Sequence, residues 1–423
     1  MLKTPIARGV ALATLGATLA IPTMAQAAFI DDSKASLELR NFYFNSDNHK
    51  NVAAPTVANP RGGQSKSEEW AQGFLLKYES GFTEGTVGFG VDAIGLLGVK
   101  LDSSPDRAGS GLLPGSYADG QGAPDDYSQL GATAKARVSN STLRVGTLIP
   151  KLPTVLATDS RLLPQTFRGA HLVSQEIDGL TLDAGRLTKN SLRSEAGYAD
   201  MTMSGKGVSG GQETDEFNFA SASYKWNPNL TTAYNYGNLD KNYKQHIVNL
   251  THVLPIGEGQ SLKSDLRYAR STDDGNTNVD NKAFGAMFTY SLSGHSVGLA
   301  YQKMSGDTGY VNINGTDQFL VNYVMISPGF DNPDEKSWQA RYDYNFAAIG
   351  LPGLTFMTRY VTGDNYGAGG NGKEWERDTD IGYVFQDGAL KNLGVKWRNG
   401  TYRSEARSID QNRLIVSYTI PLM

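Results

Sequence analysis

The chain has 423 residues, no cysteine and a formal net charge of −4 at pH 7. These features exclude disulfides and Cys-ligated metal sites, and the small net charge gives no support for a nucleic-acid partner. Glycine and tyrosine are abundant, and beyond the N-terminus no apolar run approaches the length of a membrane helix. The composition favours a secreted β-protein or a transmembrane β-barrel, whose lipid-facing residues occupy every second position.

The first 27 residues have the features of a secretory signal peptide. Lys3 and Arg8 precede an apolar stretch at 9–21, and Ala25-Gln26-Ala27 fits a small-x-small cleavage site. The apolar stretch is too short to span a bilayer, so it predicts a targeting sequence and not a membrane anchor. We therefore expect a signal peptide at 1–27 and a single β-barrel domain at 28–423.

The mature chain alternates between apolar and polar residues. The pattern is clearest near the C-terminus, where Leu414, Val416, Tyr418 and Ile420 form one apolar face. Short turns alternate along the chain with longer polar loops, as in barrels with short periplasmic turns and long external loops. The sequence predicts an all-β fold, a transmembrane antiparallel β-barrel of about 18 strands.

The segment at 151–169 departs from this pattern. Its sequence is KLPTVLATDSRLLPQTFRG, interrupted by Pro153 and Pro164 and rich in apolar residues, with Arg161 and Arg168 about its centre. Such a segment needs a surface to pack against, and inside a barrel it would bury its apolar residues on the wall and narrow the lumen. An ordinary Ω-loop on a soluble β-domain is the alternative.

Basic residues recur on the polar face of the expected strands. If the apolar face meets lipid, the inward set comprises Arg40, Lys135, Arg137, Arg144, Arg341, Arg359, Lys396, Arg398 and Arg413. Any single arginine has an alternative role as a wall residue paired with a carboxylate such as Asp343 or Asp378. Together they predict a cationic track, and arginine suits carboxylate recognition because its planar fork binds both oxygens.

No motif in the sequence predicts an enzyme. A Gly-x-Ser-x-Gly elbow and a phosphate-binding loop are both absent, and no histidine pair has ligand spacing. We therefore expect no catalytic residues, no cofactor and no metal. A hydrolase site dispersed over a barrel is the alternative left open.

Several long strings resemble the OprD-type outer-membrane porins of pseudomonads, and the resemblance runs over essentially the whole mature chain. The strings are Ser160–Gly169, Glu335–Asp343, Leu351–Tyr360, Glu374–Asp378 and Leu390–Arg398. The resemblance implies an eighteen-stranded barrel in the outer membrane, with the third and seventh external loops, here 151–169 and 305–335, folded inward. It also implies a ladder of arginines and lysines that guides the carboxylate of a small solute.

The inward or outward position of each residue in the alternation, together with the resemblance, predicts two sets of site residues. The substrate-binding ladder comprises Arg40, Arg144, Arg168, Arg186, Arg341, Arg359, Lys396, Arg398 and Arg413. The constriction loops contribute Arg161, Leu162, Pro164, Phe167 and Asp317. For Arg186 the strand parity slips between Ala184 and Leu187, which suggests a bulge.

The resemblance implies a substrate-specific porin for passive diffusion of small carboxylates. The strings Trp397–Asn399 and Asn412–Tyr418 look more like the aromatic-acid branch, with benzoate- or vanillate-type solutes. The alternatives are a channel for basic amino acids and small peptides, with Asp317 and Asp331 as acidic partners, and a general-diffusion porin.

Beyond these solutes, the expected partners are outer-membrane lipid and the barrel-assembly machinery. A monomer or a loose homotrimer is expected. Barrels of this kind commonly end in Phe or Trp, so the terminal Met423 is a departure from the family pattern that concerns the efficiency of assembly more than the fold.

Overall fold

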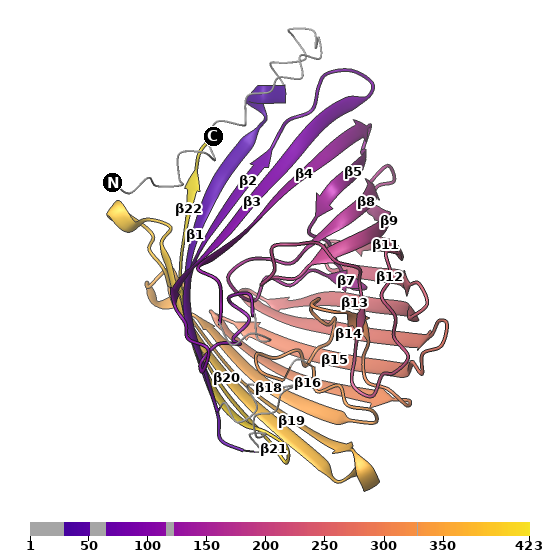
Figure 1. Ribbon diagram of the computed structural model, residues 1–423, viewed down its shortest axis with the longest axis vertical. Coiled ribbons are helices and arrows are strands. Elements are labelled where there is room, and N and C mark those ends of the chain that lie inside the picture. The colour runs from indigo at the N-terminus through magenta and orange to yellow at the C-terminus, as the bar shows by residue number, and fades with distance from the viewer. Residues whose placement is uncertain (1–28, 51–64, 116–121, 328) are drawn as a thin grey trace.

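A computed structural model describes residues 29–50, 65–115, 122–327 and 329–423. The expected signal peptide at 1–27 lies outside the described residues and stays a prediction. Eighteen strands form one antiparallel sheet that closes on itself (Figure 1). Closure joins the first and last strands, with Arg40 opposite Ser417. The predicted fold is confirmed.

The strands of the barrel follow one another around the wall in chain order. They are β1 (Lys34–Asn48), β2 (Lys66–Glu79), β3 (Gly88–Asp102), β4 (Asp126–Val138), β5 (Ser141–Leu148), β8 (Thr166–Ser174), β9 (Leu180–Ser191), β11 (Phe217–Asn227), β12 (Leu230–Leu239), β13 (Tyr243–Gly257), β14 (Gln260–Asp273), β15 (Asp280–Leu292), β16 (His295–Ser305), β18 (Lys336–Asn345), β19 (Leu354–Tyr366), β20 (Gly372–Val384), β21 (Gly394–Ser404) and β22 (Ser408–Pro421). Short elements lie in the connections: β6 (Lys151–Leu152), β7 (Val155–Leu156), β10 (Met203–Ser204), β17 (Asn312–Ile313) and the 3-10 helices η2 (Phe346–Ile349), η3 (Ala368–Gly370) and η4 (Gly388–Leu390).

Short turns join the strands at the end of the barrel where β1 begins and β22 ends, and the longer loops lie at the other end. Three of these external loops matter for the site: L3 at 149–165, L4 at 192–216 and L7 at 306–335. The polar stretches at 362–376 and 399–410 have the composition of loops but are mostly strand, because β19 runs to Tyr366 and β21 to Ser404. Beyond the membrane both faces of a strand are polar, so the alternation that marks a strand in the sequence disappears.

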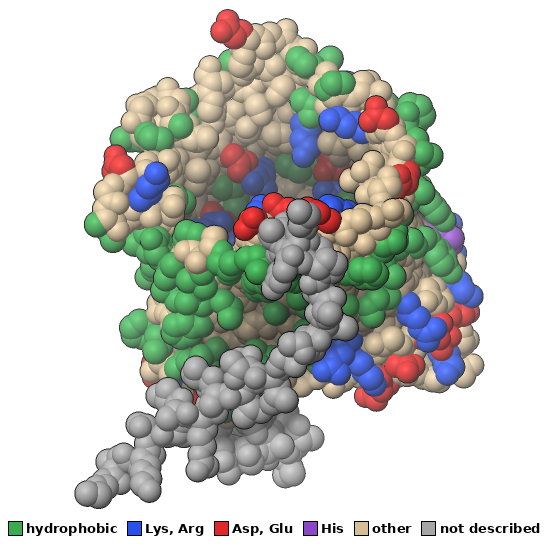
Figure 2. Space-filling model, turned by 90° about the horizontal axis from the view of Figure 1, so that it is seen from above, with side chains coloured by type: hydrophobic (Ala, Val, Ile, Leu, Met, Phe, Trp, Pro, Cys, Tyr) green, Lys and Arg blue, Asp and Glu red, His purple; other side chains and the backbone are tan. Residues whose placement is uncertain are grey.

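The wall carries apolar residues outside and polar residues inside. Leu130, Leu299 and Trp338 are among the exposed apolar side chains, and they alternate with buried polar residues such as Gln129 and Gln339. Figure 2 shows a hollow bordered by charged side chains, with hydrophobic side chains gathered over the outer surface. In the described parts of the chain, no helix is both long and apolar enough to cross a membrane.

The hydrophobic core lies in the lumen, between the inward loops and the wall. Val155 and Ala157 of L3 pack with Phe167 and Phe217 of the wall, and Leu162 packs in a second cluster with Phe42. Burying a side chain of this size contributes about 1.5–3 kcal/mol, which explains why an apolar loop folds inward. The inward constriction loop is therefore observed.

The constriction loop is shorter than its sequence suggested. L3 ends at Gln165, and the residues Thr166 to Gly169 belong to β8, where Phe167 pairs with Leu148 of β5. Phe167 and Arg168 are therefore wall residues and not loop residues, which corrects the prediction. The boundary between loop and strand is hard to locate in the sequence, because the alternation of β8 begins directly after Pro164 and Gln165.

Candidate functional site

Three loops meet inside the barrel and hold one another in place. The Asp317 N–H of L7 donates to the Leu156 carbonyl of L3 at 2.8 Å, and the Gln165 amide donates to the Asn314 carbonyl at 3.1 Å. L4 joins them through β10, which pairs with β17 of L7. The constriction is thus a single hydrogen-bonded unit built from L3, L4 and L7.

A cavity of about 460 Å³ lies where this unit faces the arginine-bearing wall. Its lining residues are Ser160, Arg161, Arg193, Ser204, Asn312, Gly315, Thr316, Asp317, Gln318, Tyr323, Val324, Met325, Ile326, Arg359, Arg398 and Arg413. Five of these described residues are arginines and one is an aspartate. We call this cavity the eyelet. Its lining favours anions.

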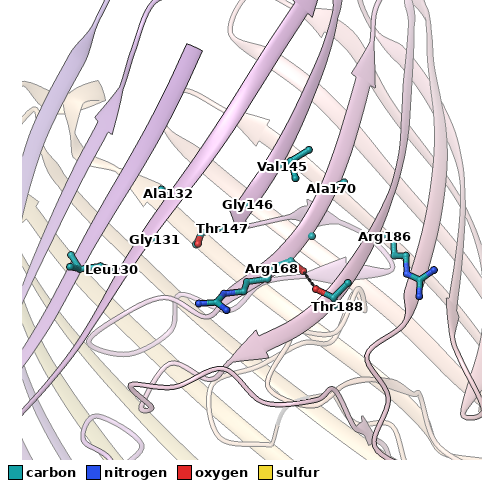
Figure 3. A pocket seen from close by; sticks show the side chains of 11 residues that line it. Leu130, Gly131, Ala132, Val145, Gly146, Thr147, Arg168, Ala170, Arg186 and Thr188 are labelled. Carbon is teal, nitrogen blue, oxygen red and sulfur yellow. Dashed lines mark hydrogen bonds between the residues drawn. The ribbon is translucent and has the colours of Figure 1, made fainter. Parts of the chain in front are cut away.

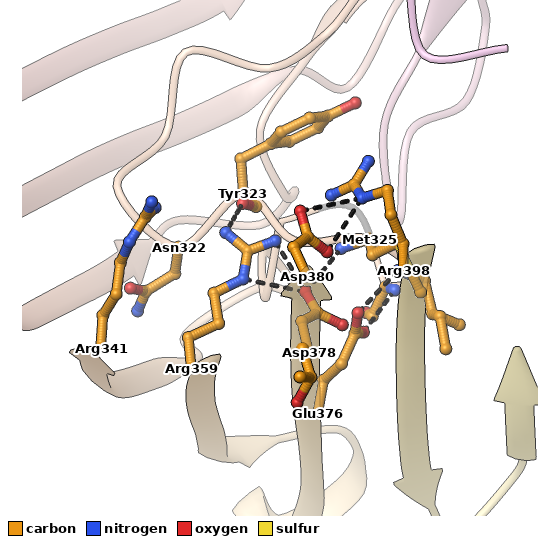
Figure 4. Close-up of polar contacts among 12 residues, drawn as sticks. Asn322, Tyr323, Met325, Arg341, Arg359, Glu376, Asp378, Asp380 and Arg398 are labelled. Carbon is orange, nitrogen blue, oxygen red and sulfur yellow. Dashed lines mark hydrogen bonds and ion pairs between the residues drawn. The ribbon is translucent and has the colours of Figure 1, made fainter. Parts of the chain in front are cut away.

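The wall arginines are held by carboxylates on neighbouring strands (Figure 4). The Arg359 Nε donates to Asp378 at 2.8 Å, and the Arg398 Nε donates to Asp380 at 3.0 Å. The strand register explains both pairs, because Arg359 lies opposite Asp378 and Arg398 lies opposite Asp380. Such pairs fix the direction of each guanidinium and cancel part of its charge.

The same strand, β20, also anchors L7 through its inward acids. The backbone N–H groups of Ile326 and Ser327 each donate to Glu376 at 2.7 Å, and that of Met325 donates to Asp378 at 3.2 Å. Buried carboxylates need such donors, and here the loop backbone supplies them. β20 therefore sets the position of both the arginines and the loop that faces them.

Three eyelet arginines have no carboxylate partner among the described residues. Arg413, only 2% exposed, donates to Gln411 at 2.8 Å and to the Met325 carbonyl at 2.9 Å. Arg161 donates to the Ser110 carbonyl at 3.0 Å, and Arg193 to the Ser160 hydroxyl at 3.0 Å. These neutral acceptors orient the three guanidinium groups and leave their charge uncompensated.

Burial has an electrostatic consequence for the two loop arginines, Arg161 and Arg193. Burial, and after it the nearby Arg413, holds the pKa of the Arg161 guanidinium well below its usual range. Burial likewise lowers the pKa of Arg193. Arginine nevertheless stays charged in proteins. A bound anion would restore the stabilisation that burial removes, so the eyelet is poised for an anionic solute.

The single eyelet acid, Asp317, is bound by Tyr323. The Tyr323 hydroxyl donates to Asp317 at 2.6 Å. Burial, followed by this carboxylate, raises the pKa of Tyr323 above its ordinary value. The second predicted acid, Asp331, is 2% exposed and pairs with Lys206 at 3.0 Å, so it does not line the eyelet. In the described chain no group of three His, Cys, Asp or Glu residues could hold a metal ion.

The structure brings together five of the predicted site residues: Arg161, Asp317, Arg359, Arg398 and Arg413. Four others face the lumen without lining the eyelet: Arg40, Arg144, Arg341 and Lys396. Arg341 pairs with Asp343 at 2.7 Å, and Lys396 with Asp380 at 3.3 Å. Arg144 lies opposite Lys135 and His171 in the sheet. These four lie on the lumen wall outside the eyelet.

Arg40 has a structural role that the sequence did not suggest. Its guanidinium donates to Asp159 at 2.7 Å and to the Arg161 carbonyl at 3.0 Å, so it ties L3 to β1. Leu162 and Pro164 are both buried in L3, and a Cβ on Gly73 would come within 3.2 Å of Leu162. The glycine allows this close approach of loop and wall.

Arg168 and Arg186 lie on the outer face of the barrel, which corrects their place in the ladder. Arg168 follows Phe167, whose side chain is fully buried in the lumen core, so it points the other way. Arg186 shares its face with the exposed Leu182 and pairs with Glu216 at 2.9 Å. The register of β8 and β9 shifts between Arg168 and Gly169, whose partners are Lys189 and Leu187. The bulge therefore lies at Thr188, just beyond the stretch Ala184–Leu187 in which it was expected, and Arg186 stays on the outer face.

Sequence reasoning missed Arg193 and Tyr323. It assigned no inward position to L4, the loop that carries Arg193. A signal was present, because L4 contains Met201, Met203 and Val208, and these pack on the lumen core. Apolar residues in an otherwise polar loop were the same feature that identified L3.

The comparisons with known proteins agree with this geometry. Residues 27–422 match the model of the OprD family, described as outer membrane porins. The chain is 37% identical to "Porin-like protein GalP" of Pseudomonas putida over 97% of each protein. Among solved structures it is similar to Pseudomonas aeruginosa OpdQ, with 59% identity, a TM-score of 0.84 and coverage of 94% and 100%. It is also similar to a BenF-like porin from Pseudomonas fluorescens Pf-5, with 40% identity, a TM-score of 0.86 and coverage of 93% and 100%.

The match spans the whole barrel, including the inward loops and the arginine-bearing strands β19, β21 and β22. A chain of this fold and family is an outer-membrane channel and not an enzyme. We conclude that the chain belongs to the OprD family of substrate-specific outer-membrane porins.

Proposed function

We propose that this porin conducts small monocarboxylates, aromatic acids such as benzoate among them, by passive diffusion through the eyelet. The observation that carries the proposal is the set of three arginines, Arg161, Arg193 and Arg413, without a carboxylate partner in the described chain. Their charge attracts the solute carboxylate, and the paired Arg359 and Arg398 beside them offer further donors. Several sites of moderate affinity permit flux, because one tight site would retain the solute.

The preference for an aromatic solute rests on the wall that L7 presents. Tyr323, Val324, Met325 and Ile326 line the eyelet together with the arginines. An aromatic acid has a charged end for the guanidinium groups and a flat apolar body for this segment. The volume of about 460 Å³ accommodates a single-ring acid.

The second candidate is a basic or zwitterionic amino acid, and Asp317 is the observation that favours it. This carboxylate lines the eyelet near the arginines and would bind an ammonium group while they bind the carboxylate. Among the described residues that line the eyelet, Asp317 is the one acid, and Asp331 is engaged by Lys206. A dibasic solute would need two, so the monocarboxylate is the better fit. A general-diffusion pore conflicts with the inward L3, L4 and L7.

Single-channel recording of the purified barrel in planar bilayers tests the proposal. We expect benzoate to permeate and to block the chloride current, and arginine to do so more weakly. Replacing Arg193 by Gln should weaken the benzoate effect about 5- to 30-fold, as for the loss of about 1–2 kcal/mol. Arg377→Gln is the control, because Arg377 lies on the outer face of β20 and hydrogen-bonds only Asn399 and Thr401 weakly.

Two results would reject the proposal. Arginine permeating well while benzoate is excluded would favour the amino-acid channel. Equal benzoate block in wild type and in the Arg193→Gln variant would show that the unpaired arginines do not contact the solute.

A further inference from the structure

The barrel wall is incompletely paired at the external end of β4. Along β3, residues 126–137 of β4 are all paired. Along β5 the pairing begins only at Thr133, opposite Gly146, which has a φ of 139°. Residues 127–132 therefore have no strand partner on their β5 side. Unpaired backbone groups are costly where a wall faces lipid, so this edge calls for a polar partner.

A hollow of about 470 Å³ opens in the outer surface at this edge (Figure 3). Leu130, which is 83% exposed, and Val145 form its apolar rim, and Arg168 and Arg186 lie on its β8 and β9 side. Three glycines, Gly131, Gly146 and Gly169, line it. At Gly131 a Cβ would come within 2.6 Å of the Thr147 side chain, so the close approach of β5 requires glycine there.

The two arginines of the hollow differ in how much of their charge is compensated. Arg186 shares an ion pair with Glu216 at 2.9 Å. Arg168 stacks on the Tyr198 ring at 4.2 Å, and its guanidinium has no carboxylate partner in the part of the chain that the structure describes. The hollow therefore carries a net positive charge on an otherwise apolar surface.

The hollow lies at the boundary between the apolar and polar parts of the outer face. On β4, Leu130 and Ala132 are apolar, and Ser128 and Asp126 follow toward the external loops. On β9, Leu182 and Ala184 are followed by Arg186 and Thr188. The change from apolar to polar side chains marks the depth at which lipid headgroups begin.

We propose that this hollow binds the phosphate group of a phosphorylated outer-membrane lipid. Arg168 contacts the phosphate with its planar fork, Arg186 adds a weaker contact, and an acyl chain packs on Leu130 and Val145. Arginine–phosphate pairs are bidentate and strong, and basic pockets at the membrane boundary suit lipid headgroups. The unpaired edge of β4 supplies further backbone donors to the same oxygens.

Native mass spectrometry of the barrel with bound lipid tests this proposal. The barrel is incubated in detergent with a phosphorylated glycolipid or with the same lipid after removal of its phosphates. Wild type should retain the phosphorylated lipid, and Arg168→Gln should retain about 5- to 30-fold less. The control Arg377→Gln removes an outward arginine on β20, outside the hollow, and should behave as wild type. Heat-modifiable gel mobility confirms that each barrel is folded.

Three outcomes would overturn the proposal. Equal retention by Arg168→Gln and wild type is the first, and equal retention of the dephosphorylated lipid is the second. The third is displacement of the lipid by millimolar inorganic phosphate, which would indicate a simple anion site. If Arg168→Gln fails to fold, Arg186→Gln takes its place and should reduce retention to a smaller extent. The anion selectivity of Arg168→Gln should equal that of wild type, because its side chain lies outside the lumen.

Discussion

The ion pair between Arg398 and Asp380 offers a sharp test of the eyelet, because its two members should act in opposite directions. Asp380 accepts from Arg398 at 3.0 Å and from Lys396 at 3.3 Å. Replacing Arg398 by Gln removes a positive charge and leaves the aspartate with Lys396 as its remaining partner. Replacing Asp380 by Asn leaves both cations without their carboxylate. The first change should lower anion selectivity, and the second should raise it.

The magnitude follows from Coulomb's law. For an anion at about 6 Å from either group and an effective dielectric constant of about 40–80, one unit charge contributes about 0.7–1.4 kcal/mol. This corresponds to about a 3- to 10-fold change in the anion-to-cation permeability ratio. The double variant should return to within about twofold of wild type, because both members of the pair are lost together.

Reversal potentials in a salt gradient across a planar bilayer measure this ratio. The shifts should shrink as salt rises from about 0.1 M to about 1 M, since the Debye length falls from about 10 Å to about 3 Å. The reasoning is refuted if both single variants shift the ratio in the same direction. It is also refuted if folded single variants leave the ratio unchanged, which would place the pair outside the ion path.

Three further predictions concern the loops and the wall. Burial, and after it Glu374, raises the pKa of Glu335 in L7 to about 9. The neutral carboxyl therefore stabilises the fold at low pH, and this stabilisation is lost as the pH rises through about 9. Current noise should therefore increase above about pH 9 in wild type and remain flat in Glu335→Gln. Arg40→Ala removes the hydrogen bonds that tie L3 to β1, and it should lower the free energy that holds L3 on the wall by about 2–4 kcal/mol. The single-channel conductance should become larger and noisier, and unchanged current traces would contradict this role of Arg40. Val416→Lys, on the outer face, should lower the free energy of unfolding by up to about 2–4 kcal/mol, measured by urea unfolding from liposomes. Ser417→Lys, on the inner face, should lower it much less. Equal losses in the two variants would contradict the strand register.

The sequence alone determined the features that depend on local periodicity. The alternation from Leu414 to Ile420 identified a lipid-facing strand, and the same two-residue period set Arg341, Arg359, Arg398 and Arg413 on the lumen side. The apolar residues of L3 identified an inward loop. These inferences needed only neighbouring residues, because side-chain direction in a strand and burial of an apolar segment are local properties.

Only the tertiary structure decided which charges remain available to a solute. Arg359 and Arg398 are paired with β20, whereas Arg161, Arg193 and Arg413, which lie far apart in the chain, meet in the eyelet without carboxylates. Closure of the barrel and docking of the loops create these contacts, and periodicity carries no information about them. Arg168 shows the same limit. It lies next to a loop boundary and a bulge, and there the two-residue alternation no longer indicates which face a side chain occupies.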